Sequence, residues 1–172
     1  MPYIASCDAE IVVVADSDCW TDGLTAAAAA VVDGAPWAIP HHFVHRLTEV
    51  GSDRTYAGGR WQKQPLEQMA YRGVAGGGFV IARPKDLLDV PLDSRFVGWG
   101  QEDESWARAL RTLLGEPYRG MRDLAHLWHP PQERLTRKIG SVGSRALARR
   151  YHAATGQPAQ MRALIEEIPP CL

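Results

Sequence analysis

The sequence has 172 residues, of which 45% are hydrophobic and 23% are charged, and its net charge is −1. This composition is typical of a globular domain with a hydrophobic core and excludes disordered and fibrous proteins. No apolar run approaches the roughly 18–20 residues of a membrane helix, so no membrane segment is expected. The net charge also argues against a protein whose whole surface binds nucleic acid.

The N-terminal segment and the cysteines bear on the cellular compartment. Asp8 and Glu10 follow a start without a basic stretch, so we expect no secretory signal and a cytoplasmic location. The three cysteines, Cys7, Cys19 and Cys171, form no CxxC pair. They are therefore expected to be free thiols rather than a disulfide framework or a thiolate zinc site.

The first predicted element is a strand. Residues 10–18 read EIVVVADSD, an aliphatic run that is typical of a strand buried on both faces of a parallel sheet. Ligands of open α/β sheets bind outside the carboxyl ends of strands, so Asp16 and Asp18 stand where a site is expected. Residues 24–32 (LTAAAAAVV) then predict a helix of small residues that packs closely on the sheet and ends near Gly34.

The middle of the chain predicts short elements and a loop. Residues 36–41 (PWAIPH) indicate a short strand, which Pro40 places at an edge or an end of the sheet. Residues 43–59 predict an irregular surface loop, and residues 64–71 a short helix. In residues 75–84 (AGGGFVIARP), three glycines run into an aliphatic strand that stops at the proline.

A helix with a clear apolar stripe follows. Residues 86–92 predict a short helix or turn, and an acidic cluster then opens a longer helix. In that helix Trp106, Leu110 and Leu113 fall at positions i, i+4 and i+7, and Gly115 ends it.

The last predicted strand covers residues 117–128, after which basic side chains prevail. Two amphipathic helices are expected at residues 144–154 and 158–167. We therefore divide the chain into a domain of residues 1–132 and a basic, mostly helical extension of residues 133–172.

Four features carry residue types suited to chemistry. Each also has a plain structural explanation: a helix cap, a tight turn before a strand, a core tryptophan, or one buried and one exposed histidine. The four are the acidic pair Asp16 and Asp18, the glycines 76–78, the segment WGQED at residues 99–103, and the pair His126 and His129.

In this order the four features resemble the catalytic half of GT-A-fold glycosyltransferases, most closely the β-1,4-galactosyltransferase and polypeptide N-acetylgalactosaminyltransferase group. There an aliphatic strand ends in a DxD motif (here VVVADSD), and a glycine pair precedes a strand (GGGFVIAR). A W-G-G-E-D segment opens a helix (WGQED, with Gln101 for the second glycine), and a histidine follows a late strand (HLWHPP). The resemblance covers about residues 10–132. It implies an α/β fold: a truncated GT-A-like mixed sheet flanked by helices, with the C-terminal helical extension.

The resemblance implies metal-dependent, inverting transfer of a sugar from a nucleotide sugar, a UDP-sugar before others, to an acceptor hydroxyl. A divalent ion would neutralise charge on the departing diphosphate. The implied ligands are Asp18, His126 and His129. One carboxylate with imidazoles suits Mn²⁺ better than Mg²⁺, which is the alternative ion.

The resemblance also implies the groups that would handle the two substrates. Asp103 matches the general base that takes the proton of the acceptor hydroxyl, and its place at a helix start is expected to favour the ionised carboxylate. Glu102 would hold the acceptor or orient the base. The remaining implied contacts are Asp16, Gly77 and Gly78 with the donor and Trp99 with a sugar face.

The region ahead of the DxD motif departs from the family. GT-A enzymes hold the base and ribose of the donor with a unit of roughly a hundred residues there, like other mononucleotide-binding halves. In this sequence fifteen residues precede Asp16. We therefore expect a fragment, a half completed by a second protein, or a reduced relative. We also expect self-association, a second chain or residues 144–167 to cover the apolar strand at residues 11–15.

Three other functions remain open at this point. The first is a catalytically silent glycosyltransferase-like module for binding or assembly. The second is nucleic-acid binding by the basic residues 134–150, although a solvated helical face or an acceptor lid is the better explanation of these residues. The third is a metallohydrolase that uses Asp16, Asp18, His126 and His129.

Overall fold

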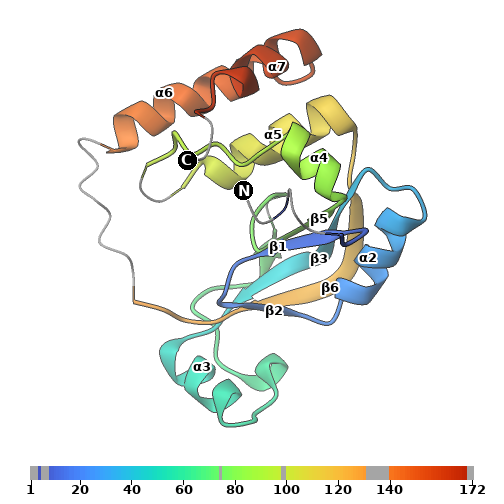
Figure 1. Ribbon diagram of the computed structural model, residues 1–172. Coiled ribbons are helices and arrows are strands. Elements are labelled where there is room, and N and C mark those ends of the chain that lie inside the picture. Colours follow the sequence, from blue (N-terminus) through green and yellow to red (C-terminus); the bar gives the residue numbers. More distant parts are fainter. Residues whose placement is uncertain (1–3, 5–7, 74, 98–99, 131–139, 170–172) are drawn as a thin grey trace.

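The computed structural model describes residues 4, 8–73, 75–97, 100–130 and 140–169. Over these residues the fold is α/β, with a mixed six-stranded sheet and six α-helices around it (Figure 1). The strands are β1 (Val12–Ala15), β2 (Cys19–Thr21), β3 (Trp37–Arg46), β4 (Tyr71–Arg72), β5 (Phe79–Ala82) and β6 (Tyr118–His126). The helices are α2 (Leu24–Val32), α3 (Glu49–Tyr56), α4 (Pro84–Asp89), α5 (Glu102–Leu114), α6 (Gly140–Ala153) and α7 (Pro158–Glu166), with a 3-10 turn η1 (Trp61–Lys63).

The sheet order is β1-β5-β3-β6-β2, and β4 also pairs with β3. The pair β3–β6 is parallel, and the other described pairs are antiparallel. A mixed sheet flanked by helices is therefore confirmed. The predictions of helices near residues 24–32, 102–114, 144–154 and 158–167 and of a late strand are also confirmed to within a few residues.

Two hydrophobic clusters cover the two faces of the sheet. On one face, α2 packs Ala27 and Val31 against Ala38 of β3 and Ile81 of β5. On the opposite face, a larger cluster joins the sheet to α4, α5, α6 and α7, with α6 and α7 forming an outer layer on α5 (Figure 1). Its largest members include Trp37, Ile39, Leu87, Trp106, Leu110, Tyr151, Met161 and Leu164. The C-terminal helices thus share one core with the sheet.

The prediction that the first strand is buried on both faces of a parallel sheet is wrong. β1 lies at an edge and pairs antiparallel with β5. Val12 and Val14 pack on the large cluster, whereas Val13 is 43% exposed. The fully buried aliphatic strand is β5. A run of valines does not distinguish these two environments, because β-branched residues suit any pleated strand.

Two predictions for the middle of the chain are also wrong. β3 runs from Trp37 through Arg46 between β5 and β6, so Pro40 lies inside a central strand and residues 43–46 are not a loop. The pairing with β6 shifts register between Ile39 and His41, and this irregularity accommodates a residue without an N–H group. The expected loop also contains α3.

The helix predicted at residues 64–71 is absent. In its place this segment follows η1 and runs beside the end of β3 and the residues after it. Thr48 donates to the carbonyl of Pro65, Glu67 donates to that of Arg46, and Leu66 bridges Leu47. Tertiary pairing has therefore overridden the local helical pattern.

No helix in the described part of the chain is both long enough and apolar enough to cross a membrane.

Candidate functional site

Sheet register brings three polar side chains into one row. Cys19 of β2 pairs with His126 of β6, and Arg46 of β3 pairs with the same His126. Directly paired residues of neighbouring strands project on one face of the sheet. The row therefore crosses three strands at the end where β3 and β6 terminate.

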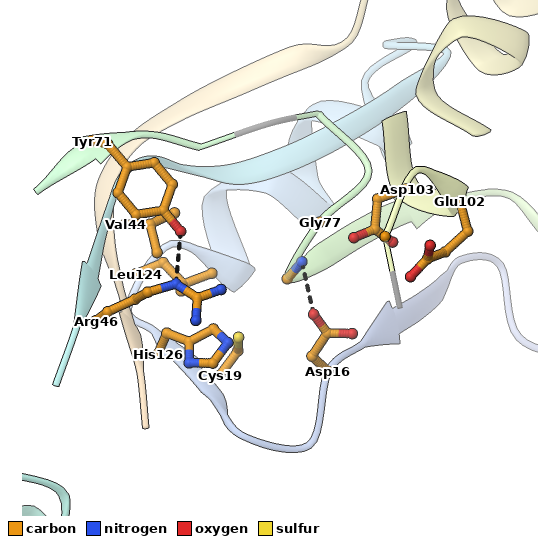
Figure 2. Close-up of a pocket in the computed structure, with 12 residues that line it drawn as sticks. Asp16, Cys19, Val44, Arg46, Tyr71, Gly77, Glu102, Asp103, Leu124 and His126 are labelled. Atoms are coloured by element: carbon orange, nitrogen blue, oxygen red, sulfur yellow. Dashed lines mark hydrogen bonds between the residues drawn. The ribbon is translucent and has the colours of Figure 1, made fainter. Parts of the chain in front are cut away.

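A pocket of about 200 Å³ opens above this row. Figure 2 shows two unlike walls: Arg46, His126 and Cys19 lie on one side, and the carboxylates of Asp16, Glu102 and Asp103 lie on the other. Of the residues implied by the resemblance, the pocket is lined by Asp16, Gly77, Gly78, Glu102, Asp103 and His126. Trp99 lies outside the described residues.

Asp18 and His129 do not line this pocket, but they join it through His126. The Nε2 atoms of His126 and His129 lie 3.7 Å and 3.3 Å from Oδ2 of Asp18. The Nδ1 atoms lie 2.9 Å from the carbonyl oxygens of Leu127 and Pro130. A carbonyl only accepts hydrogen bonds, so each Nδ1 is placed to donate to its carbonyl oxygen, and each Nε2 faces the carboxylate. Their assignment as metal ligands remains a prediction.

Asp16 is tied to the glycine loop. Its backbone N–H donates to the carbonyl of Gly78 at 2.9 Å, and its Oδ2 accepts from the N–H of Gly78 at 3.1 Å. The loop also packs on the start of α5: a Cβ on Gly76, whose φ is +94°, would lie 2.2 Å from the carbonyl oxygen of Asp103. The sequence thus needs glycine here for a close backbone approach.

The first turn of α5 presents two half-buried carboxylates. Burial, reinforced by the neighbouring Glu102 and Asp16 carboxylates, raises the pKa of Asp103 to about 7. The prediction that the helix start favours the ionised form is therefore wrong, because desolvation and like charge outweigh the helix dipole. Oε2 of Glu102 is buried without a hydrogen-bond partner among the described residues.

Gln101 precedes α5 with φ 80°, and it is the one residue other than glycine with positive φ in the described ranges. A side chain in this left-handed conformation costs roughly 1–2 kcal/mol. Glycine, which the WGGED pattern carries here, would avoid that cost but would lose more backbone entropy on folding.

Gln101→Gly is accordingly expected to raise the free energy of unfolding by about 0.5–1 kcal/mol. Urea denaturation of the purified chain measures this change. Gln101→Ala is the matched control, because it removes the side-chain amide but keeps a Cβ at positive φ. An equal gain in both variants would mean that the backbone conformation is not the source.

Sequence reasoning missed Arg46, Tyr71 and Cys19. Nε of Arg46 donates to the hydroxyl of Tyr71 at 3.1 Å, and the guanidinium extends toward His126 and Cys19 (Figure 2). The sequence predicts a loop at Arg46, whereas in the structure β3 extends to this residue and places it at the strand end. Burial, together with the carboxylates of Asp18 and Asp16, raises the pKa of the Cys19 thiol well above its usual range.

Comparisons with models of known families, with curated proteins and with solved structures give no match for this chain.

Proposed function

We propose that this chain is a metal-dependent, inverting glycosyltransferase, or the catalytic half of one, that moves a sugar from a nucleotide sugar to an acceptor hydroxyl. A UDP-sugar is the first donor to test. The proposal is carried by one observation: the Nε2 atoms of two histidines face one oxygen of Asp18 beside a pocket with an elevated-pKa carboxylate.

The donor atoms of Asp18 and His126 lie close enough together to share a divalent cation, and His129 contacts the same carboxylate. The Nε2 atoms of His126 and His129 lie 3.7 Å and 3.3 Å from Oδ2 of Asp18, and imidazole nitrogen and carboxylate oxygen are both common metal ligands. Oxygen and imidazole nitrogen are both acceptable to Mn²⁺, and Mg²⁺ is the alternative. When bound, such an ion supplies charge stabilisation for the departing diphosphate.

Asp103 is the residue that we assign as the general base. A carboxylate whose pKa is about 7 takes up a proton readily near neutral pH. As the acceptor oxygen bonds to the anomeric carbon, its proton passes to Asp103, and the bond to the diphosphate breaks with its electron pair on the diphosphate. This single displacement inverts the anomeric centre. The unpartnered Oε2 of Glu102 is suited to accept a hydrogen bond from an acceptor hydroxyl.

We assign Arg46 the role of binding the departing diphosphate. No carboxylate forms an ion pair with it in the part of the chain that the structure describes. Tyr71 holds Nε and leaves the terminal nitrogens toward the pocket. A guanidinium in this position suits phosphate oxygens, which it binds with charge-assisted hydrogen bonds.

Arg46→Met is therefore expected to weaken pyrophosphate binding about 10–100-fold, since hydrogen bonds to charged groups contribute roughly 1.5–3 kcal/mol. Isothermal titration in the presence of Mn²⁺ measures the affinity. The matched control is Arg54→Met, because Arg54 is exposed on α3. Equal affinities for wild type and Arg46→Met would remove Arg46 from the site.

The pocket volume favours a second candidate function. About 200 Å³ accommodates a sugar but is below the roughly 300–1,000 Å³ of sites that enclose larger ligands. A silent binding or assembly module with the same fold would need no room for the nucleotide. Release of free UDP from a panel of UDP-sugars with Mn²⁺, abolished by a chelator, supports the enzyme. Sugar binding without release supports the module.

A further inference from the structure

Cys19 lies in contact with the metal-ligand group proposed above. It opens β2 and stands opposite His126 in the antiparallel pairing with β6. Its Sγ, a carboxylate oxygen of Asp18 and a ring nitrogen of His126 all lie within 4.8 Å of one another. The thiol also donates to Oδ1 of Asp18 at 3.7 Å.

The carboxylate of Asp18 therefore contacts both the thiol and the imidazole rings. Its Oδ1 faces the sulfur, and its Oδ2 faces the Nε2 atoms of His126 and His129. A single ion among Cys19, Asp18 and His126 would meet one sulfur, one oxygen and one nitrogen. Three protein donors of these kinds match a zinc site whose fourth, tetrahedral position is left for another ligand.

We propose that Cys19 is a ligand of this centre and makes it a site for zinc-class ions, namely Zn²⁺, Co²⁺ and Cd²⁺. The inference rests on the proposed function for the centre itself and adds the thiolate and the class of ion. Soft thiolate ligands select zinc over manganese, whereas oxygen donors suit manganese. On binding, the thiol of Cys19 releases its proton to solvent and the sulfur bonds to the ion.

Titration with Co²⁺ tests the sulfur ligand without relying on activity. Wild type is expected to develop the near-ultraviolet sulfur-to-cobalt charge-transfer band, and Cys19→Ser and Cys19→Ala are expected to lack it. Zn²⁺ affinity should fall at least about 10–100-fold in both variants, while Mn²⁺ affinity changes less than about 3-fold. A protein with Cys7→Ser and Cys171→Ser is the control, and it should keep the band because Cys19 remains.

Other outcomes separate this inference from the proposed function. Cobalt that binds to wild type without a charge-transfer band, and whose binding Asp18→Asn abolishes, would overturn the role of Cys19 and leave the metal centre standing. A band that persists in Cys19→Ala would also overturn it. If wild type shows the sulfur-to-cobalt charge-transfer band but transfers no sugar, the thiolate centre is upheld and the proposed glycosyltransferase activity is rejected.

Discussion

Asp103→Asn is expected to lower sugar transfer at least about 100-fold, the usual contribution of a positioned base, and at the same time to stabilise the fold at pH 8. The activity falls because an amide takes up no proton from the acceptor hydroxyl. Transfer by wild type should rise with pH until the carboxylate is ionised, near pH 7, and then level off.

The stability gain follows from the sign of the pKa shift. Burial first, and the charges of Glu102 and Asp16 second, raise the pKa of Asp103 from 3.8 to about 7 in the folded chain. Between these two values the unfolded chain has released the proton that the folded chain retains, so stability falls as pH rises through this window. Above this pH window the full loss of stability from the buried Asp103 carboxylate is present. Solvent screening of a partly exposed group reduces the gain in the variant to about 1–3 kcal/mol.

Urea denaturation at pH 5 and pH 8, with chelator present, measures the gain, which should be larger at pH 8. Glu104→Gln is the matched control, because Glu104 lies in the same helical turn but is exposed and pairs with Arg108. Loss of stability in Asp103→Asn that equals its loss of activity would instead identify a structural helix-start residue.

Asp18→Asn is expected to lower Mn²⁺ affinity at least about 100-fold and to remove metal-dependent transfer, because the amide gives up the negative charge that both imidazoles face. The fold should persist, since the backbone carbonyl of Asp18 still accepts from the N–H of Leu127 at 2.8 Å. Electron paramagnetic resonance of free Mn²⁺ measures the affinity.

The control for this variant is Asp22→Asn. Asp22 is an exposed carboxylate close in sequence, and its Oδ1 accepts a hydrogen bond from the indole of Trp20. The Asp22→Asn variant should bind Mn²⁺ with the same affinity as wild type. Equal Mn²⁺ affinity in Asp18→Asn and wild type would mean that the ion binds elsewhere, and it would contradict the proposed metal centre.

Elements with a strong local signal were predictable from the sequence. The alanine-rich α2 and the apolar stripe of α5 each specify a helix through their own residues. The position of β1 at an edge and the passage of Pro40 through the central strand β3 were not predictable in this way. Both depend on which strands become neighbours, and that is decided by packing across the whole sheet.

The residues of the candidate site likewise include some that local sequence predicts and some that only the tertiary structure brings together. Asp16, Asp18, Asp103 and the histidines stood out because chain order and residue type marked them. Arg46 and Cys19 reach the same place only through the register of β3 and β2 against His126, which no local pattern encodes. The raised pKa of Asp103 was not predictable from the helix start alone, because the glycine loop that packs on this end of α5 lies far away in sequence.

The most direct test of the central claim is thermodynamic linkage between Mn²⁺ and the donor's leaving group. Titration of UDP into the chain with and without Mn²⁺, and of Mn²⁺ with and without UDP, should show each ligand raising the affinity of the other by the same factor, about 10-fold or more. Asp18→Asn should abolish this coupling. UDP affinity that is independent of Mn²⁺, with Mn²⁺ affinity independent of UDP, would contradict a metal centre that serves a nucleotide-sugar diphosphate.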